Sequence, residues 1–225
     1  DFSSVELAGI ELIDAGGHNN FVRGSQGDDR IAANGDYDEL HGEGGDDVFL
    51  YSGSNSGEDT LDGGAGVDRI QGSDGDDRIA LDAFAGIEQI DGGAGQDVIA
   101  GSDRGREEWD FSGVELTGIE LIDAGGHHDL VIGNAGDDHI RGGDGWDEID
   151  GGDGHDVAYF DGKFADYDVR EKTEGVVVEA LVTGEGRDKL ANVEALRFAD
   201  GIYADGGFQM VGITNNSEQL VYDGA

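Results

Sequence analysis

The 225-residue sequence contains no cysteine. Disulfide bridges, thiolate zinc sites and cysteine nucleophiles are therefore excluded. Basic residues are scarce, with 13 Lys and Arg against 52 Asp and Glu, and the formal net charge is -39. Nucleic acids and anionic membrane surfaces bind basic faces, so we expect neither as a partner. No apolar run reaches the roughly 18 residues that a membrane-spanning helix needs.

Glycine and aspartate are abundant, and they recur together with a period of nine residues. The frame Gly-Gly-x-Gly-x-Asp-x-apolar-x is followed by GGAGVDRIQ (63–71), GGDGWDEID (142–150) and GGDGHDVAY (151–159). Eleven of twelve copies have aspartate at the sixth position, and the twelfth has Asn20. An acidic chain with few large apolar residues is often disordered, but this regular spacing favours a folded repeat. The eleven aspartates are Asp29, Asp38, Asp47, Asp59, Asp68, Asp77, Asp97, Asp129, Asp138, Asp147 and Asp156.

A second period of 109 residues contains the first. The segment DFSSVELAGIELIDAGGHNNFVRGSQGDDRI from Asp1 matches the segment from Asp110 at 22 of 31 positions, and a shorter relative begins at Ala85. Periods nested in this way indicate a solenoid. The opening residues recur in mid-chain and lack the pattern of a secretory leader, so we expect the sequence to be part of a longer protein.

Each nonapeptide predicts one turn and one short strand. Glycines permit left-handed backbone and close approach of neighbouring segments, which suits a tight turn. The last three residues form a strand with one side chain pointing inward, and two repeats make one coil. The GIELID pieces continue the coil with wider turns. The predicted inward residues are Ile31, Leu40, Phe49, Leu61, Ile70, Ile79, Ile99, Val131, Ile140 and Ile149.

Stacking of the coils places each sixth-position aspartate over the one two repeats earlier. Asp138 then pairs with Asp156 on one edge, and Asp129 with Asp147 on the other. Two carboxylates about 5 Å apart repel by roughly 1 kcal/mol in water and by more at lower dielectric. A calcium ion about 2.3–2.6 Å from each oxygen would bridge them, assisted by the carbonyls of the glycine turns. A preference for turns alone would also accept asparagine or serine there, so we predict calcium ligands.

The repeat resembles the calcium-binding nonapeptides of the RTX (repeats-in-toxin) family over most of residues 15–159. The resemblance implies an all-β fold, a parallel β-roll or right-handed β-solenoid, in which the first six residues of each repeat bind Ca²⁺. It also implies type I secretion to the outside of the cell. Asn20 and the loose copy ANGDYDELH (33–41) depart from the pattern. We expect roughly six to eight ions for this many stacked turns, held by the eleven aspartates and by Gly27, Gly66, Gly75, Gly95, Gly136, Gly145 and Gly154.

The glycine frame ends near residue 160. We therefore expect a calcium-binding roll over residues 1–159, with the second long repeat incomplete, and a C-terminal β cap over residues 160–225. The segment YDVREKTEGVVVEALV alternates like a hairpin about Glu174–Gly175. A solenoid needs such a cap because its last strands otherwise present an open edge.

No catalytic motif is present, and we predict that this part of the protein is not an enzyme, although a catalytic domain elsewhere in the full protein stays open. His18, His127 and His128 are expected to be solvated turn residues. Two functions fit: a calcium-driven module that supports secretion and stability of a larger protein, or a calcium-dependent module that binds extracellular polysaccharide. The second would use exposed aromatics, with Trp109, Trp146, Tyr37, Tyr51 and Tyr159 as the candidates.

Overall fold

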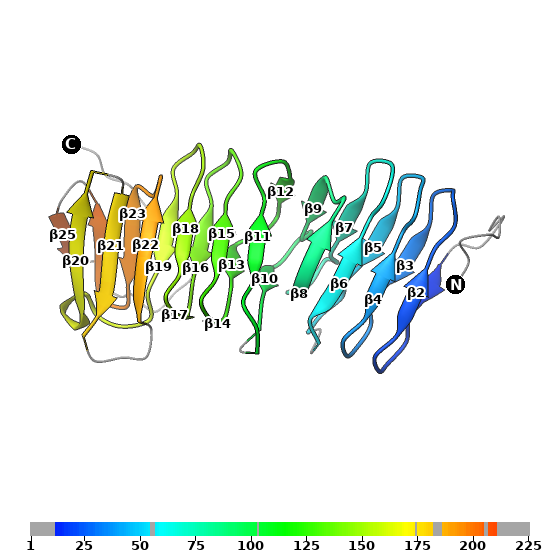
Figure 1. The fold of residues 1–225 in the computed structure, drawn as a ribbon, viewed down its shortest axis with the longest axis horizontal. Helices are drawn as coiled ribbons and strands as arrows, with labels where there is room; N and C mark the ends of the chain where they lie inside the picture. Colours follow the sequence, from blue (N-terminus) through cyan, green and yellow to red (C-terminus); the bar gives the residue numbers. More distant parts are fainter. Residues whose placement is uncertain are drawn as a thin grey trace.

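The computed structural model describes residues 12–54, 57–102, 104–173, 175–181, 186–204 and 207–210. Short strands stack along one axis into an elongated solenoid (Figure 1). The helix within these ranges is a single 3₁₀ turn, η1 (Phe164–Asp166). No helix in the described part of the chain is long and apolar enough to cross a membrane. The predicted all-β parallel roll is confirmed.

The strands form two long faces, one of which changes from one sheet to another along the axis. The first sheet contains, in order of pairing, β1 (Ile13–Asp14), β3 (Arg30–Ala32), β5 (Val48–Leu50), β7 (Arg69–Gln71), β9 (Gln89–Asp91) and β12 (Glu115–Thr117). The second contains β2 (Phe21–Arg23), β4 (Glu39–His41), β6 (Asp59–Asp62), β8 (Arg78–Ala85), β10 (Val98–Ala100), β13 (Leu121–Asp123), β16 (His139–Arg141), β19 (Val157–Tyr159), β23 (Ala195–Phe198), β24 (Gly201–Ala204) and β25 (Gly207–Met210). The third contains β11 (Glu108–Asp110), β15 (Leu130–Ile132), β18 (Glu148–Asp150), β22 (Arg187–Ala191), β21 (Gly175–Ala180) and β20 (Tyr167–Lys172), and β14 (Gly126–His127) pairs with β17 (Asp144–Gly145).

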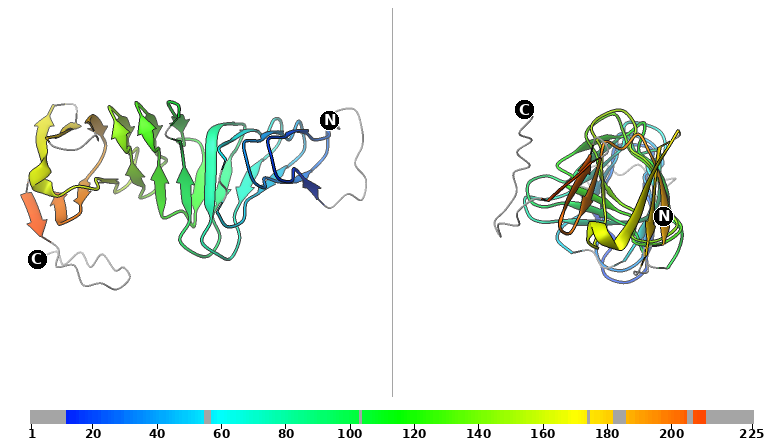
Figure 2. Two further views of the ribbon diagram at one scale, coloured as in Figure 1. Left: turned by 90° about the horizontal axis from the view of Figure 1, so that it is seen from below. Right: turned by 90° about the vertical axis from the view of Figure 1, so that its left-hand side faces the viewer.

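From β1 to β10, consecutive strands alternate between the first and second sheets, so two repeats make one coil. Ile31 pairs with Phe49, and Phe49 with Ile70, in parallel register. The middle residue of each strand therefore lies over the middle residue of the next coil, and these residues form the buried core. Figure 2 shows the roll end-on in its right-hand view. All ten predicted inward side chains are buried. Each such side chain contributes roughly 1.5–3 kcal/mol through burial.

A junction near the middle of the stack interrupts the regular coils. The eight-residue strand β8 pairs through its first half with β10 and through its second half with β6. The first sheet ends at β12, and the third begins at β11. Large aromatic side chains fill the space, with Phe84 stacked on Phe111 at a centroid distance of 5.1 Å and Trp109 edge-on to Phe111 at 6.0 Å.

Trp109 is consequently a core residue, with 1 % of its surface exposed. The prediction that Trp109 stacks on a sugar at the surface is wrong, because the offset between the sheets leaves an interior gap that the indole fills. The other tryptophan, Trp146, lies on a turn and is 64 % exposed.

The C-terminal end of the stack turns antiparallel. The last parallel pairs are β18 with β22 and β19 with β23. The strands β20 and β21 form the predicted hairpin, with Lys172 opposite Gly175, and β24 returns along β23. Phe160, Tyr167 and Phe198 pack together here, with ring centroids 5.1–5.4 Å apart.

We predict that Trp109→Ala lowers the free energy of unfolding by about 3–5 kcal/mol, because it empties a filled part of the junction core. The matched variant Trp146→Ala should change it by less than about 0.5 kcal/mol, since that indole is mostly in solvent. Chemical denaturation in saturating calcium measures both. Equal losses in the two variants would contradict the junction packing.

Candidate metal-binding turns

Turns that begin with glycine leave no room for a side chain at that first position. A Cβ on Gly42 would lie 2.1 Å from Asp47 Oδ2 and 2.5 Å from the carbonyl oxygen of Gly63 in the next coil. A Cβ on Gly151 would lie 2.4 Å from Asp156 Oδ2 and 2.2 Å from the carbonyl oxygen of Asn192. The carboxylate of each turn and a carbonyl of the next coil thus converge on the space that the glycine leaves open.

The eleven predicted aspartates are all buried, with at most 6 % of their surface exposed. They form hydrogen-bonded columns along the edges of the roll. Asp29 N–H donates to Asp47 Oδ1 at 2.7 Å, Asp129 N–H to Asp147 Oδ1 at 2.9 Å, and Asp138 N–H to Asp156 Oδ1 at 2.8 Å. The predicted pairing of Asp138 with Asp156 and of Asp129 with Asp147 is confirmed.

The second carboxylate oxygen distinguishes the aspartates from one another. In seven of them Oδ2 is buried and has no hydrogen-bond partner in the described part of the chain: Asp38, Asp47, Asp68, Asp97, Asp129, Asp147 and Asp156. Glu107 Oε2 is also buried and has no hydrogen-bond partner among the described residues. A buried carboxylate oxygen without a donor is costly unless a proton or a cation compensates it.

The pKa values of these carboxyl groups reflect the same cost. Burial first, and then neighbouring carboxylates such as Asp68, together raise the pKa of Asp47 to about 7. Burial likewise raises the pKa of Asp147 and of Asp156 to about 6. The pKa of Asp129 is raised by burial and by the adjacent Glu107 carboxylate. Without a cation, the folded turns therefore hold protons more tightly than free carboxyl groups do.

The donor set fits a hard divalent cation. In the described residues no three His, Asp or Glu side chains gather closely enough to hold a metal by themselves. Each turn instead offers a carboxylate oxygen together with backbone carbonyl oxygens, and calcium accepts such mixed oxygen ligands. The residues present could hold Ca²⁺ between successive turns, where the ion would replace the missing hydrogen-bond donor at Oδ2.

The fourth-position glycines differ among the turns. Gly66, Gly95, Gly145 and Gly154 have left-handed backbone, with φ between 139° and 151°. Gly27, Gly75 and Gly136 do not. All seven lie in the turns of the aspartates that precede the strands, and their role as carbonyl ligands stays a prediction.

Several glutamates complete the columns, and the sequence argument missed them. Asp68 N–H donates to Glu88 Oε2 at 2.8 Å, and Asp97 N–H to Glu120 Oε2 at 2.6 Å. Asp156 N–H donates to Glu194 Oε2 at 2.8 Å. Each glutamate follows two residues after a left-handed Gly86, Gly118 or Asn192. The recurring signal is the Glu of GIEQID, GIELID and NVEALRF, where a wider turn requires a longer side chain to reach the same position.

The remaining sequence candidates lie in different settings. Tyr51 is 2 % exposed and its hydroxyl donates to Asp59 Oδ2 at 2.8 Å, so this aromatic candidate offers no surface for stacking on a sugar. Tyr37 and Tyr159 are half-buried. Trp146 is exposed, with its ring centroid 5.8 Å from that of His128. His18, His127 and His128 are exposed, as predicted, although His127 ends the short strand β14.

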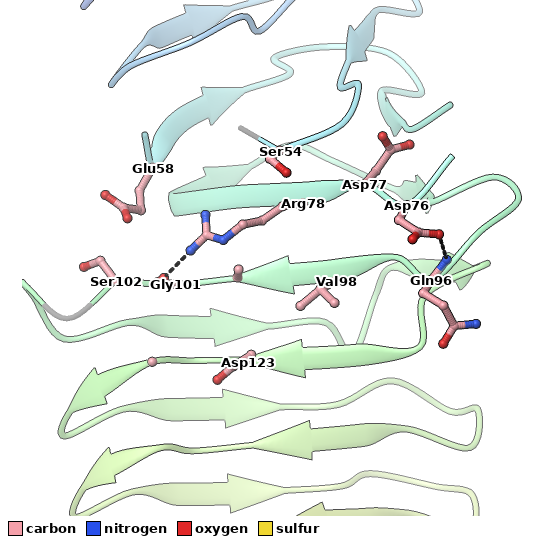
Figure 3. A pocket seen from close by; sticks show the side chains of 12 residues that line it. Ser54, Glu58, Asp76, Asp77, Arg78, Gln96, Val98, Gly101, Ser102 and Asp123 are labelled. Carbon is pink, nitrogen blue, oxygen red and sulfur yellow. Dashed lines mark hydrogen bonds between the residues drawn. The ribbon is translucent and has the colours of Figure 1, made fainter. Parts of the chain in front are cut away.

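A cleft of about 490 Å³ opens at the junction, beside the turn of Asp77. Figure 3 shows the guanidinium of Arg78 directed to the carbonyl oxygen of Gly101, to which it donates at 3.1 Å. Glu58 and Asp123 lie on the walls of the same cleft. The arginine in this cleft is therefore already hydrogen-bonded to the backbone at the junction.

Parallel coils with a buried carboxylate at each glycine turn define a calcium-binding β-roll. The chain matches the RTX calcium-binding nonapeptide repeat in four copies, over residues 8–51, 54–85, 82–103 and 123–158. These segments cover more than half of the sequence, and the chain belongs to this family, as its resemblance indicated. The family is a structural calcium-binding one rather than a catalytic one. Comparison with curated proteins finds no match.

We predict that the calcium-free fold is more stable at pH 5 than at pH 8. The raised carboxyl pKa values mean that protonation favours the folded state. This stabilisation is complete below the ordinary value of 3.8 and is lost as the pH rises through about 6 to 7. Circular dichroism of protein stripped of calcium on a chelating resin measures it.

The matched control is Asp47→Asn, which keeps an acceptor for Asp29 N–H and removes the charge. Its calcium-free β-signal should persist to higher pH than that of the unsubstituted chain. A calcium-free signal no larger at pH 5 than at pH 8 would contradict the prediction.

Proposed function

We propose that this chain is an extracellular module that folds on binding Ca²⁺ between its stacked turns and so supports the export and stability of a larger secreted protein. The observation that carries this proposal is the set of seven buried aspartate oxygens for which the described residues supply no donor. These oxygens make the metal-free roll unfavourable at neutral pH. Binding of calcium would then supply folding free energy.

The charge of the chain supports the same function. The chain has 52 acidic and 13 basic residues, so its basic side chains are too few to neutralise its carboxylates. Where calcium is scarce, as inside a cell, mutual repulsion would keep the acidic chain extended and ready for export. Where calcium is abundant, the ions would close the turns and drive the coils together.

The C-terminal strands support a capping role for residues 160–225. The hairpin β20–β21 and the return strand β24 are antiparallel to the roll, and they cover the strand edges that β22 and β23 would otherwise expose. Covering these edges prevents pairing with another chain. We place the boundary between roll and cap near residue 160, while β22 and β23 add a last parallel coil to the roll.

Calcium removal at pH 8 should abolish the β-spectrum, and added calcium should restore it. Magnesium at the same concentration should not restore it, because Mg²⁺ keeps several waters and requires stricter octahedral geometry. Circular dichroism with a calcium chelator measures this. A full β-spectrum in excess chelator would refute calcium-coupled folding.

A second candidate function is calcium-dependent binding of extracellular polysaccharide. The observation that favours it is the exposed indole of Trp146, which lies beside the His128 ring on the edge of the roll. An exposed aromatic face can stack on a sugar ring, and calcium in the adjacent turn of Asp147 would help to order the surface.

If this candidate function holds, Trp146→Ala should weaken binding to acidic glycans at least tenfold while leaving calcium-dependent folding unchanged. The control is Phe21→Ala, which removes another exposed aromatic, on β2 at the other end of the roll. Titration with acidic and neutral glycans, with and without calcium, measures both variants. Absence of calcium-dependent glycan binding in the unsubstituted chain would eliminate this function.

A further inference from the structure

The turns of the roll are of two kinds, which differ in whether the chain itself satisfies the aspartate. In an open turn, Oδ2 of the sixth-position aspartate is buried without a partner, as in the seven turns described above. In a closed turn, a backbone N–H of the same turn donates to Oδ2. The closed turns contain Asp29, Asp77 and Asp138.

The second residue of the turn closes it. Ser25 N–H donates to Asp29 Oδ2 at 2.6 Å, and Asn134 N–H donates to Asp138 Oδ2 at 2.7 Å. The side chain of the same residue then accepts a hydrogen bond from the fourth-position glycine, with Gly27 N–H to Ser25 Oγ at 3.1 Å. Ser73 makes both contacts in the turn of Asp77. These contacts occupy the groups that a cation would otherwise compensate.

The backbone conformation explains why the open turns stay open. Six of the seven have a left-handed residue at the second position, and the seventh, that of Asp38, has left-handed Gly35 at the third. Within the described residues the second N–H of these six turns makes no hydrogen bond to Oδ2, and Gly93 N–H and Gly152 N–H donate instead to Asp91 Oδ1 and Asp150 Oδ1. The six second-position residues are Glu43, Gly64, Gly93, Gly125, Gly143 and Gly152. Ser25, Ser73 and Asn134 have ordinary negative φ and therefore can donate to Oδ2.

Asn20 shows a different way of closing a turn. Its N–H donates to Asp38 Oδ1 at 2.8 Å, so Asn20 occupies the aspartate position of the column. Its side-chain amide donates to the carbonyl oxygen of His18 in its own turn. The equivalent turn 109 residues later has Asp129, whose Oδ2 is buried without a partner. Where the carboxylate is absent, an amide donor already satisfies a carbonyl of the turn.

We propose that, among the turns of the nonapeptide frame, Ca²⁺ loads only the seven open ones, and that the turns of Asp29, Asp77, Asp138 and Asn20 are closed by the chain and take no ion. The proposal rests on the proposed function and refines it. The turn of Asp59 is also closed, in this case because the Tyr51 hydroxyl donates to Asp59 Oδ2. The closed turns are spread along the stack, so each can order a coil before calcium binds, and the open turns between them then respond to the ion.

Three variants of the full chain test this division by the number of calcium ions bound at equilibrium dialysis. Asp138→Asn and Asp156→Asn change adjacent coils of one column, the first closed and the second open. Asp156→Asn should lose one ion, whereas Asp138→Asn should lose none. Asn20→Asp should gain one ion, because it restores the carboxylate that Asp129 supplies in the equivalent turn.

The outcomes separate the inference from the function on which it rests. Loss of an ion in Asp138→Asn, or no gain in Asn20→Asp, would overturn the division into open and closed turns. An unsubstituted chain that binds no calcium would instead refute the proposed function. Circular dichroism in saturating calcium establishes that each variant is folded, and the gain expected for Asn20→Asp keeps the test decisive if Asp156→Asn does not fold.

Discussion

The whole roll depends on a carboxylate buried at the same place in each turn. One oxygen accepts a backbone N–H from the preceding coil, as Asp47 does from Asp29, and so fixes how the coils stack. The other oxygen is left in a site where water does not reach it, and in Asp47 it has no donor. Each buried carboxylate oxygen without a donor lowers the stability of the roll. The roll is therefore stable only when protons or cations compensate these oxygens at the turns.

The chain's own basic residues cannot take that role. Many of their ion pairs lie at the surface, as with Arg106 and Glu108, whose charged atoms are 2.9 Å apart. Exposed pairs of this kind contribute little to stability, typically below about 1 kcal/mol. The buried aspartates stand apart from these pairs, behind the glycine turns. A small divalent ion bound by carbonyl and carboxylate oxygens fits that confined space, whereas an arginine side chain does not.

Solenoid coils contact mainly their neighbours, so irregularities stay local and can be accommodated. At the junction, Trp109 and Phe111 fill the offset between the first and third sheets. Where a coil lacks the six-residue turn, Glu88 or Glu194 reaches the position that aspartate holds elsewhere. The hydrogen-bonded column therefore continues through changes in turn length that interrupt the nonapeptide frame.

The sequence by itself determined the all-β roll, the two repeats per coil, the inward residues and the aspartate columns, because period and residue type alone fix which side chains face inward in a solenoid. Tertiary structure decided what depends on neighbouring coils. Trp109 is an aromatic on a short strand in the sequence, and only the sheet offset makes it a core residue. Likewise, Asp138 and Asp156 occupy the same position of the repeat. They differ because Asn134 N–H donates to one carboxylate, whereas the N–H of left-handed Gly152 donates to Asp150 rather than to the other.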